Sequence, residues 1–302
     1  MRCVVFGGAG FVGARLAREL LSQADCELVI ADNLSGPQSS WLISTILSDP
    51  RVRFVHMDIR KEKDFSQLSA QPYDRVYHLA ASFANALSES SPQLDFDTNV
   101  TGTGNVITFA QNTRSQHLIY TGSSSSYGAS TAALSECGPM NPQTAYARNK
   151  LLGEQLVCEA DLPWSIFRLF NVYGPGDYSG PNRNVIPNMM AALCVGKPLH
   201  LLGQGCTRDF NLIDDLLPVL CAPEAAAGQI LNLSGGRETS IETMLELLLS
   251  VAAQPGFPVT RGPLRSWDRV ERRVADVSAL QEVYGSVART TLSDGLAETW
   301  RW

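Results

Sequence analysis

The 302-residue sequence has no apolar run long enough to cross a membrane and no excess of positive charge. A membrane-spanning helix needs about 18 or more consecutive apolar residues, and no such stretch occurs. The formal net charge of −6 argues against nucleic acid or an anionic membrane as a sequence-independent partner. Residues 1–6 lead into a glycine loop, and no charged leader or cleavage site precedes it. We therefore expect a cytoplasmic protein.

The sequence also lacks paired or clustered cysteines. Its seven cysteines are scattered, odd in number and never spaced as C-x-x-C, whereas a disulfide framework or a zinc site needs pairs or clusters. We expect free thiols in a reducing compartment and no metal site. Hydrophobic residues make up 44% and charged residues 18%, which is ordinary for a globular protein.

Short apolar segments alternate with helical patterns through the first 170 residues. The segments are rich in Val, Ile, Leu or aromatic residues, as strands buried on both faces are, and they cover 3–6, 27–31, 52–56, 75–79, 117–120 and 164–170. The helical patterns cover 11–22, 94–112 and 144–160. Such alternation predicts an α/β fold with a doubly wound parallel sheet of the Rossmann kind.

The pattern changes after residue 170. Residues 171–183 are rich in glycine and proline and are predicted to be loop. Helical patterns follow at 185–195, 214–221 and 240–253, with a strand-like segment at 229–233. We expect residues 1–170 to form a dinucleotide-binding domain to which 207–236 return, and 171–302 to form mainly a smaller, mixed α/β substrate domain.

A glycine-rich loop follows the first predicted strand. Gly7, Gly10 and Gly13 suit a sharp turn, a close approach to a pyrophosphate and tight packing of helix on strand. The following helix, which begins at Phe11 and Val12, directs its free N–H groups at the phosphates. This spacing is weak evidence alone, but its place between a strand and an amphipathic helix strengthens it.

Asp32 and Asn33 end the second predicted strand, where an acid accepts the ribose hydroxyls of a dinucleotide. A carboxylate there repels a 2′-phosphate, so we predict NAD rather than NADP as the cofactor. Asp58 and Ile59, after the third strand, are candidates for contact with the adenine, and the alternative is that Asp58 only caps the strand end. The fourth strand ends in further candidate residues for the cofactor cleft, Leu79, Ala80 and Ala81.

Tyr146 and Lys150 lie four residues apart in a helical pattern, so they share one helix face. A free phenol titrates near about 10, but a neighbouring ammonium and oxidised nicotinamide lower that value. Tyr146 can then remove a sugar hydroxyl proton as hydride leaves the same carbon. A serine-rich turn, 121–128, closes the fifth strand at the sheet edge where α/β proteins bind ligands, and a hydroxyl there can assist.

These motifs, in this order, resemble the extended short-chain dehydrogenase/reductases, and specifically the NAD-dependent nucleotide-sugar epimerase/dehydratase group. The resemblance spans nearly the whole chain and includes residues 78–81, Asn99 with Gly102, and residues 168–175. It implies that Tyr146 and Lys150 are catalytic and contact NAD, that Ser123 assists, and that NAD stays bound.

The resemblance also assigns a nucleotide-sugar site in the second half of the chain. It implies that Asn171 bonds the phosphate or sugar, that the helix start at Asn184 and Val185 faces the diphosphate, and that Arg208 grips it. Arg265 and Asp268 complete the clamp in this picture. Surface positions are the alternative for both arginines.

Departures from related enzymes narrow the reaction. Sugar 4,6-dehydratases carry Asp-Glu after the assisting hydroxyl residue, but here Ser124 and Ser125 stand there, as candidates for substrate contact. Decarboxylases usually keep a Glu in that turn, and it is absent too. We therefore predict a UDP-sugar 4-epimerase that works through a 4-keto sugar. The alternatives are a 4-ketoreductase, a dehydratase with an unusual acid, or a non-catalytic NAD-binding sensor. The resemblance implies a homodimer formed through helices 94–112 and 144–160.

Overall fold

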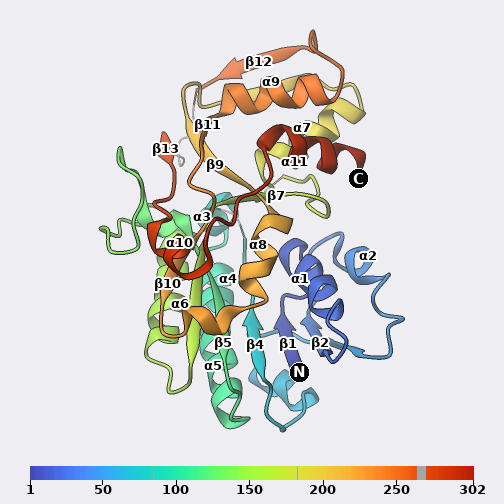
Figure 1. Cartoon of the computed structure of the whole chain (residues 1–302), viewed down its shortest axis with the longest axis vertical. Helices are drawn as coiled ribbons and strands as arrows, with labels where there is room; N and C mark the ends of the chain where they lie inside the picture. Colours follow the sequence, from blue (N-terminus) through green and yellow to red (C-terminus); the bar gives the residue numbers. More distant parts are fainter. Residues whose placement is uncertain (84, 182, 264–269) are drawn as a thin grey trace. The chain divides into compact units, whose positions relative to one another are not determined.

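A computed structural model describes residues 1–83, 85–181, 183–263 and 270–302. Its largest element is a seven-stranded sheet in the order β3-β2-β1-β4-β5-β6-β10 (Figure 1). The strands are β1 (Arg2–Phe6), β2 (Glu27–Asp32), β3 (Val52–His56), β4 (Arg75–His78), β5 (Leu118–Ser123), β6 (Trp164–Leu169) and β10 (Ile230–Leu233). The predicted doubly wound parallel sheet is confirmed, because the order reverses beside β1 and helices flank the sheet.

Helices connect the strands of this sheet. α1 (Phe11–Leu21) packs on β1 and β2, α5 (Gly102–Asn112) on β4, and α6 (Ala145–Cys158) on β5. Beside them lie α2 (Ser39–Ile43), α3 (Asn85–Ser90), α4 (Pro92–Phe96), the 3₁₀ turns η1 (Glu62–Gln67) and η3 (Ser124–Tyr127), and the π-helical turn η2 (Asp97–Thr101). The helix predicted over 94–112 is confirmed, because α4, η2 and α5 follow one another without a break, with a π-helical turn between the two α-helical parts.

Aromatic side chains fill the core on one side of this sheet. The rings of Phe6 and Phe109 meet edge to face with centroids 5.7 Å apart, and Phe65 lies 5.6 Å from each of them. Buried aliphatic residues of the neighbouring strands surround these rings. Such burial removes large apolar areas from water and fixes the strands that end at the predicted cofactor site.

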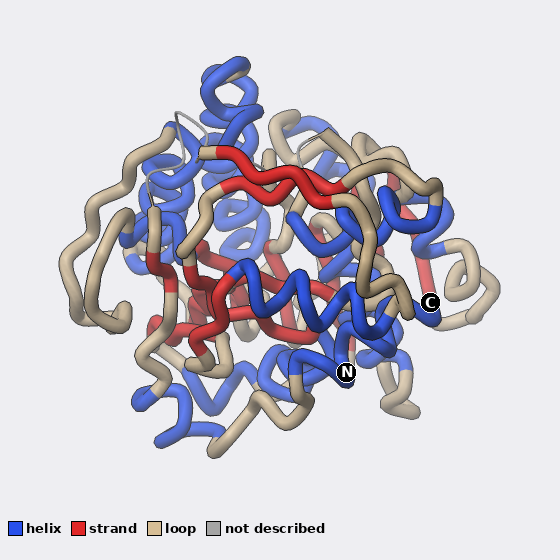
Figure 2. Tube along the Cα trace, turned by 90° about the horizontal axis from the view of Figure 1, so that it is seen from above, coloured by secondary structure: helices blue, strands red, loops and turns tan. Residues whose placement is uncertain are grey.

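The chain divides into two compact units. The first comprises residues 1–123, 143–168 and 217–231, and the second comprises 124–142, 169–216 and 232–302. Strands of the second unit include β7 (Asn171–Tyr173), β8 (Leu199–Leu202), β9 (Thr207–Leu212), β11 (Glu238–Ser240), β12 (Val259–Gly262) and β13 (Arg272–Arg273). β9 pairs with β7, β11 and β13, while β8 and β12 run side by side as a two-stranded sheet (Figure 2).

One prediction for this half of the chain was wrong. Residues 171–173, expected to be loop, form β7, which pairs in parallel with β9 from Asn171 opposite Phe210 to Tyr173 opposite Leu212. The glycine- and proline-rich composition begins only at Gly174, whose φ of +145° turns the chain out of the strand. The composition of the following loop thus concealed a three-residue strand.

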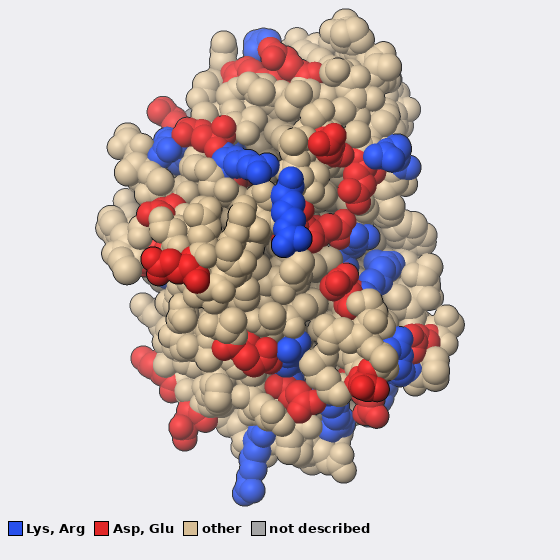
Figure 3. Space-filling view, in the orientation of Figure 1, with Lys and Arg blue, Asp and Glu red and all other residues tan. Residues whose placement is uncertain are grey.

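The remaining helical elements lie after β7 in the chain. They are α7 (Val185–Cys194), α8 (Ile213–Leu220), the 3₁₀ turn η4 (Pro223–Ala226), α9 (Ile241–Val251), α10 (Ser278–Tyr284) and α11 (Leu292–Arg301). Among the described residues, no helix combines the length and apolar character that crossing a bilayer requires. Acidic and basic side chains are interspersed over the face that Figure 3 shows. All seven cysteines carry free thiols in this structure.

Candidate functional site

The predicted cofactor loop connects β1 to α1 in the first unit. Gly7 has a φ of +80°, and a Cβ added to it would lie 2.5 Å from the backbone nitrogen of Ala80. A Cβ on Gly13 would lie 2.2 Å from the carbonyl oxygen of Gly7. Only glycine fits at these two positions, because backbone atoms cannot move aside as a flexible side chain can. The loop therefore has the tight path that a pyrophosphate cradle needs.

The start of α1 is left open by its own sequence. Gly10 is the N-cap residue and has no side chain to occupy the first N–H groups of the helix, and no acidic residue lies in its first turn. Free N–H groups and the positive end of the helix dipole attract an anion. Phe11 is buried and Val12 half-buried at this helix start. These features fit the phosphates of NAD.

Asp32 lies beside the same loop. Its carboxylate accepts hydrogen bonds from the backbone N–H of Ala9 at 3.0 Å and from that of Leu34 at 2.8 Å. Burial raises the pKa of Asp32, and these two donors oppose the rise. The side chain is thus fixed at the end of β2, where an acid can accept ribose hydroxyls. Asn33 follows Asp32 in the chain, and its side-chain oxygen accepts a hydrogen bond from the N–H of Ser35 at 3.0 Å.

The surroundings of Asp58 agree with the alternative weighed from the sequence. The Asp58 carboxylate accepts from the backbone N–H of Arg60 at 3.0 Å and pairs with its guanidinium, which lowers the pKa of Asp58 to about 2. This is the geometry of a strand-end cap. Ile59 is buried and packs toward Gly102, where a Cβ would lie 2.7 Å from the Ile59 Cδ1. Either residue can still border an adenine with its remaining surface.

The loop after β4 is held by Asn99. The amide of Asn99 accepts from the N–H of Ser82 at 3.1 Å and donates to the Ser82 carbonyl at 3.2 Å. The three residues before Ser82 are half-buried and follow directly on the sheet, because Leu79 continues the pairing with Phe6. The structure therefore brings the predicted cofactor residues Leu79, Ala80 and Ala81 to the edge that carries the glycine loop.

Tyr146 and Lys150 lie on the first turns of α6. Thr144 caps this helix by accepting from the N–H of Ala147 at 3.2 Å. Both predicted catalytic side chains are buried, Tyr146 at 8% and Lys150 at 3% exposure, and Ser123 is buried at the end of β5. Burial lowers the pKa of Lys150 to about 7, although nearby carboxylates oppose this shift. Strongly shifted pKa values of this kind cluster at functional sites.

A buried ion pair, missed from the sequence, lies one helical turn beyond Lys150. Glu154 accepts from the Nε and Nη2 of Arg168 at 3.0 and 2.8 Å, and both side chains are almost fully buried. Burial raises the pKa of Glu154, and Arg168 opposes this rise. The signal was available, because residues 146, 150 and 154 follow one helix face at a spacing of four.

In the second unit, the predicted substrate residues occupy strand and helix ends. Ser124 and Ser125 are buried in η3, Asn171 begins β7, and Asn184 is the N-cap of α7 ahead of Val185. The Asn184 amide donates to the Val172 carbonyl at 3.3 Å and makes no side-chain cap bond. The N–H groups that start α7 can therefore receive an anion.

Arg208 is buried on β9. Its Nη1 donates to the carbonyls of Thr207 at 2.8 Å and Glu271 at 3.1 Å, which fixes the guanidinium. A guanidinium held in this way suits bidentate recognition of phosphate. Arg265 and Asp268, the other predicted clamp residues, lie outside the described residues.

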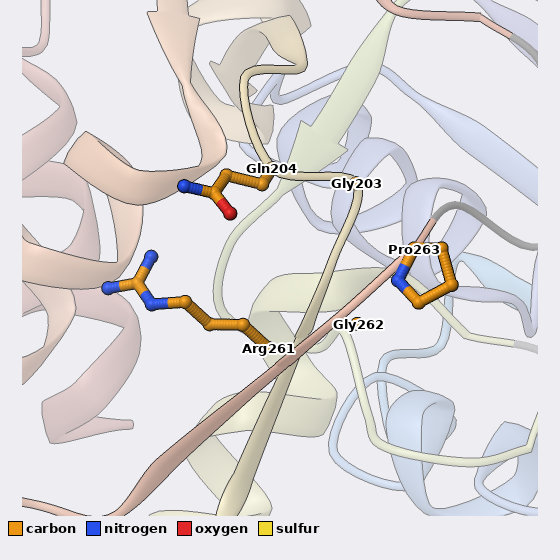
Figure 4. Close-up of a pocket in the computed structure, with 5 residues that line it drawn as sticks. All are labelled: Gly203, Gln204, Arg261, Gly262 and Pro263. Carbon is orange, nitrogen blue, oxygen red and sulfur yellow. The ribbon is translucent and has the colours of Figure 1, made fainter.

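Two features of the second unit were not predicted. Asp177 is buried, and burial raises its pKa to about 7 although Arg183 opposes the rise. A pocket is lined by Gly203, Gln204, Arg261, Gly262 and Pro263. Figure 4 shows the side chains of Gln204 and Arg261 extending to the same side of it. None of the predicted site residues that the structure describes lines this pocket.

Comparisons with known sequences find one family model and relatives that catalyse different reactions. Residues 3–233 match the model of the NAD dependent epimerase/dehydratase family. The chain is 31% identical to the UDP-glucose 4-epimerase of Mycolicibacterium smegmatis, over 99% of this chain and 97% of that protein. It is 29% identical to the UDP-N-acetyl-alpha-D-glucosaminuronate decarboxylase of Bacillus cytotoxicus, over 100% and 97% of the two chains.

Solved structures are similar over the whole chain. The epimerase Mth375 of Methanothermobacter thermautotrophicus superposes with a TM-score of 0.93 at 30% identity, covering 100% of this chain and 91% of that one. DesIV, a dTDP-glucose 4,6-dehydratase of Streptomyces venezuelae solved with NAD bound, superposes with a TM-score of 0.90 at 27% identity, covering 100% and 96%. Epimerases, a decarboxylase and a dehydratase thus share this fold.

Proposed function

Because this chain belongs to the NAD-dependent epimerase/dehydratase family, we propose that it is a nucleotide-sugar 4-epimerase acting on a UDP-hexose or a related sugar through a 4-keto intermediate. The family match confirms the resemblance predicted from the sequence, and NAD is the cofactor of the family. The choice of 4-epimerisation, the UDP group and the residue roles given below are parts of the proposal.

In this proposal the first unit holds NAD. Gly7, Gly10 and Gly13 leave room for the pyrophosphate at the start of α1. The Asp32 carboxylate accepts hydrogen bonds from the ribose hydroxyls. Residues 79–81 and Asn99 line the cleft towards the nicotinamide. When bound, NAD supplies the acceptor and donor of hydride for the sugar carbon.

Tyr146 is the acid–base residue in this proposal. The Lys150 ammonium favours the phenolate of Tyr146, which then takes the proton of the sugar O4 as the carbonyl forms. Ser123 donates a hydrogen bond to the same oxygen. The carbonyl C4 is planar, so after the sugar has turned over a hydride can return to its other face while Tyr146 returns the proton to O4, which gives the C4 epimer.

The second unit binds the nucleotide sugar in this proposal. Asn171 contacts the phosphate or the sugar, and the start of α7 at Asn184 and Val185 faces the diphosphate together with Arg208. We propose UDP because relatives similar over nearly the whole chain, an epimerase and a decarboxylase, carry UDP-sugar names. Binding through the diphosphate fixes that part of the substrate and leaves the hexose free to rotate about its link to the phosphate.

The serine turn is the observation that carries the choice of reaction. η3 reads Ser-Ser-Ser-Tyr, so neither Ser124 nor Ser125 supplies the acid or carboxylate base that expulsion of water requires. Epimerisation needs only the hydroxyl and the Tyr146–Lys150 pair. Because the chain is also similar to a decarboxylase and a dehydratase, the assay must also detect loss of carbon dioxide and loss of water.

We also propose a homodimer. Leu94 and Phe96 on α4 and Leu152 on α6 are 39%, 41% and 41% exposed. The two helices pack side by side, so these apolar side chains can form one surface. Sedimentation of the purified protein tests this, and a monomer at micromolar concentration contradicts it.

A product assay tests the reaction. The purified protein is incubated with a panel of UDP- and dTDP-linked hexoses and uronates, without added NAD or NADH, and the products are separated. We expect a C4 epimer of at least one UDP-sugar at equilibrium. A product that has lost water or carbon dioxide, or a reaction that needs stoichiometric NADH, contradicts epimerisation and identifies the alternative.

A further inference from the structure

Lys150 is surrounded by titratable groups from several elements of the first unit. Glu154 and Tyr146 share its helix, α6, and Asp95 lies on α4. From the sheet, the Tyr120 ring of β5 lies 4.1 Å from the Lys150 Nζ, and the charge of Lys150 helps to lower the pKa of His78 on β4. The state of Lys150 therefore depends on the sum of these charges.

The largest of the opposing charges is already paired. Glu154 forms a buried ion pair with Arg168, so these two side chains together contribute little net charge. His78 is fully buried, and burial together with the Lys150 charge lowers its pKa to about 3, which keeps it neutral. Burial keeps the pKa of Tyr120 well above its ordinary range, so this phenol is neutral too. Asp95 is the carboxylate that remains.

Asp95 is placed as a counter-charge. It is 0% exposed, and the amide of Asn149, the residue next to Lys150, donates to its Oδ1 at 2.8 Å. Among the described residues, no hydrogen bond partner reaches its Oδ2. Burial raises the pKa of Asp95 and Glu89 on α3 adds to the rise, whereas the side chains of Asn149 and Asn99 and the charge of Lys150 oppose it. A buried carboxylate with an unsatisfied oxygen is costly unless a cation compensates for it.

We propose that Asp95 is a positioning residue, whose buried carboxylate fixes Asn149 at the base of α6 and keeps the neighbouring Lys150 in its ammonium form. Asp95 acts through Lys150 and not on the sugar. The proposal rests on the proposed function for its catalytic meaning, because a charged Lys150 is what favours the phenolate of Tyr146. The charge relation itself can be measured without turnover.

The sequence makes that measurement simple. The chain has only four lysines, Lys61, Lys63, Lys150 and Lys197, and the other three are exposed. A protein labelled with ¹³C at the lysine Cε therefore gives few signals in an NMR titration, and Lys150→Arg assigns the buried one. The three exposed lysines serve as internal references in every sample.

The test compares Asp95→Asn with Asp97→Asn. The first removes the buried charge and keeps an oxygen that can accept from Asn149. The second removes the same charge from a half-exposed position two residues along the chain. We expect Asp95→Asn to move the Lys150 midpoint to lower pH by about one unit or more, because loss of a nearby opposite charge from a buried site disfavours the ammonium by roughly that amount. Asp97→Asn is expected to leave the midpoint in place.

The outcomes separate this proposal from the proposed function. An unchanged Lys150 midpoint in Asp95→Asn, or an equal shift in Asp97→Asn, overturns the role of Asp95 even when the protein epimerises a sugar. A shift in Asp95→Asn alone supports it even when no panel sugar is converted. If Asp95→Asn does not fold, Asp95→Ser, which also removes the charge, takes its place with the same expectation.

Turnover provides the catalytic half of the test. Where the product assay finds a substrate, the alkaline limb of the kcat–pH profile is expected at lower pH in Asp95→Asn than in the parent and in Asp97→Asn. A merely structural role lowers kcat equally at all pH values, and this result contradicts the proposal.

Discussion

The ammonium of Lys150 lies 4.1 Å from the centre of the Tyr120 ring, and the Tyr120 hydroxyl donates to the Lys150 carbonyl at 3.3 Å. One tyrosine of β5 thus contacts both the charge and the backbone of this residue. A cation over an aromatic face is stabilised by about 0.5–2 kcal/mol, more when water is excluded. The contact fixes an ammonium that burial alone would neutralise.

The stability of Lys150→Met relative to the parent is expected to depend on pH and to be most favourable at low pH. Below about pH 7 the folded protein buries a charged lysine. This cost fades as pH rises from there toward the ordinary lysine value near 10.4, where the unfolded chain also loses its proton. The Tm of Lys150→Met minus that of the parent should therefore be larger at pH 6 than at pH 9, by calorimetry without added NAD. Lys197→Met, at an exposed position, is the control. A difference that grows with pH contradicts a buried ammonium.

Glu154→Gln is expected to destabilise the protein by roughly 3–5 kcal/mol, because it leaves the buried Arg168 guanidinium without its counter-charge. The free energy of unfolding of the double variant Glu154→Leu with Arg168→Met should be closer to that of the parent than that of Glu154→Gln or of Arg168→Met alone, since no isolated charge remains. Urea denaturation measures both. If the double variant loses as much as the sum of the single ones, the pair does not act as a unit.

Gly13→Ala and Gly104→Ala are expected to have opposite effects. A methyl group on Gly13 meets the backbone oxygen of Gly7, so the loop must open and both stability and NAD affinity should fall. A methyl group on Gly104, in α5, meets nothing within 4 Å. Alanine there should stabilise the protein by about 0.5–1 kcal/mol through helix propensity. Thermal unfolding and NAD titration of the two variants check this, and equal losses in both would show that the clash at Gly13 is not the cause.

Asp32→Ala is expected to weaken NAD binding and to reduce the preference for NAD over NADP. The carboxylate is fixed by the N–H groups of Ala9 and Leu34, so its loss removes a placed acceptor for ribose hydroxyls as well as a charge that repels a 2′-phosphate. Loss of a hydrogen bond to a charged group corresponds to roughly 1.5–3 kcal/mol. Fluorescence titration with both cofactors measures the ratio of dissociation constants. An unchanged ratio places the ribose elsewhere.

The sheet and its glycine loop could be predicted because their signals are local. Strand bounds agree within a few residues at β1 to β5, where each strand is a short apolar run between helical or loop patterns. β7 could not be predicted, because three residues carry too little periodicity and their pairing with β9 is distant in sequence. The π-helical turn η2 within the predicted helix likewise has no clear signal at residues 97–101.

The candidate site was predictable where chemistry follows a fixed spacing, as for Tyr146 and Lys150. Asp95 was not, because a carboxylate in a polar helical segment is ordinarily exposed, and the packing of α4 against α6 and α3 buries it. The partner of Glu154 was hidden for a similar reason, since Arg168 comes from a strand that follows α6. Contacts between elements decide which polar residues become part of a site.

The most direct test of the central claim is the turnover of Tyr146→Phe beside the parent on the panel of nucleotide sugars. The change removes the phenol hydroxyl and keeps the ring that lies 6.3 Å from Phe83. We expect epimerisation to fall by about 10²–10⁴-fold, the usual contribution of a general acid–base group, while NAD remains bound. A Tyr146→Phe protein that epimerises at the rate of the parent, or a parent that converts none of the sugars, contradicts the account.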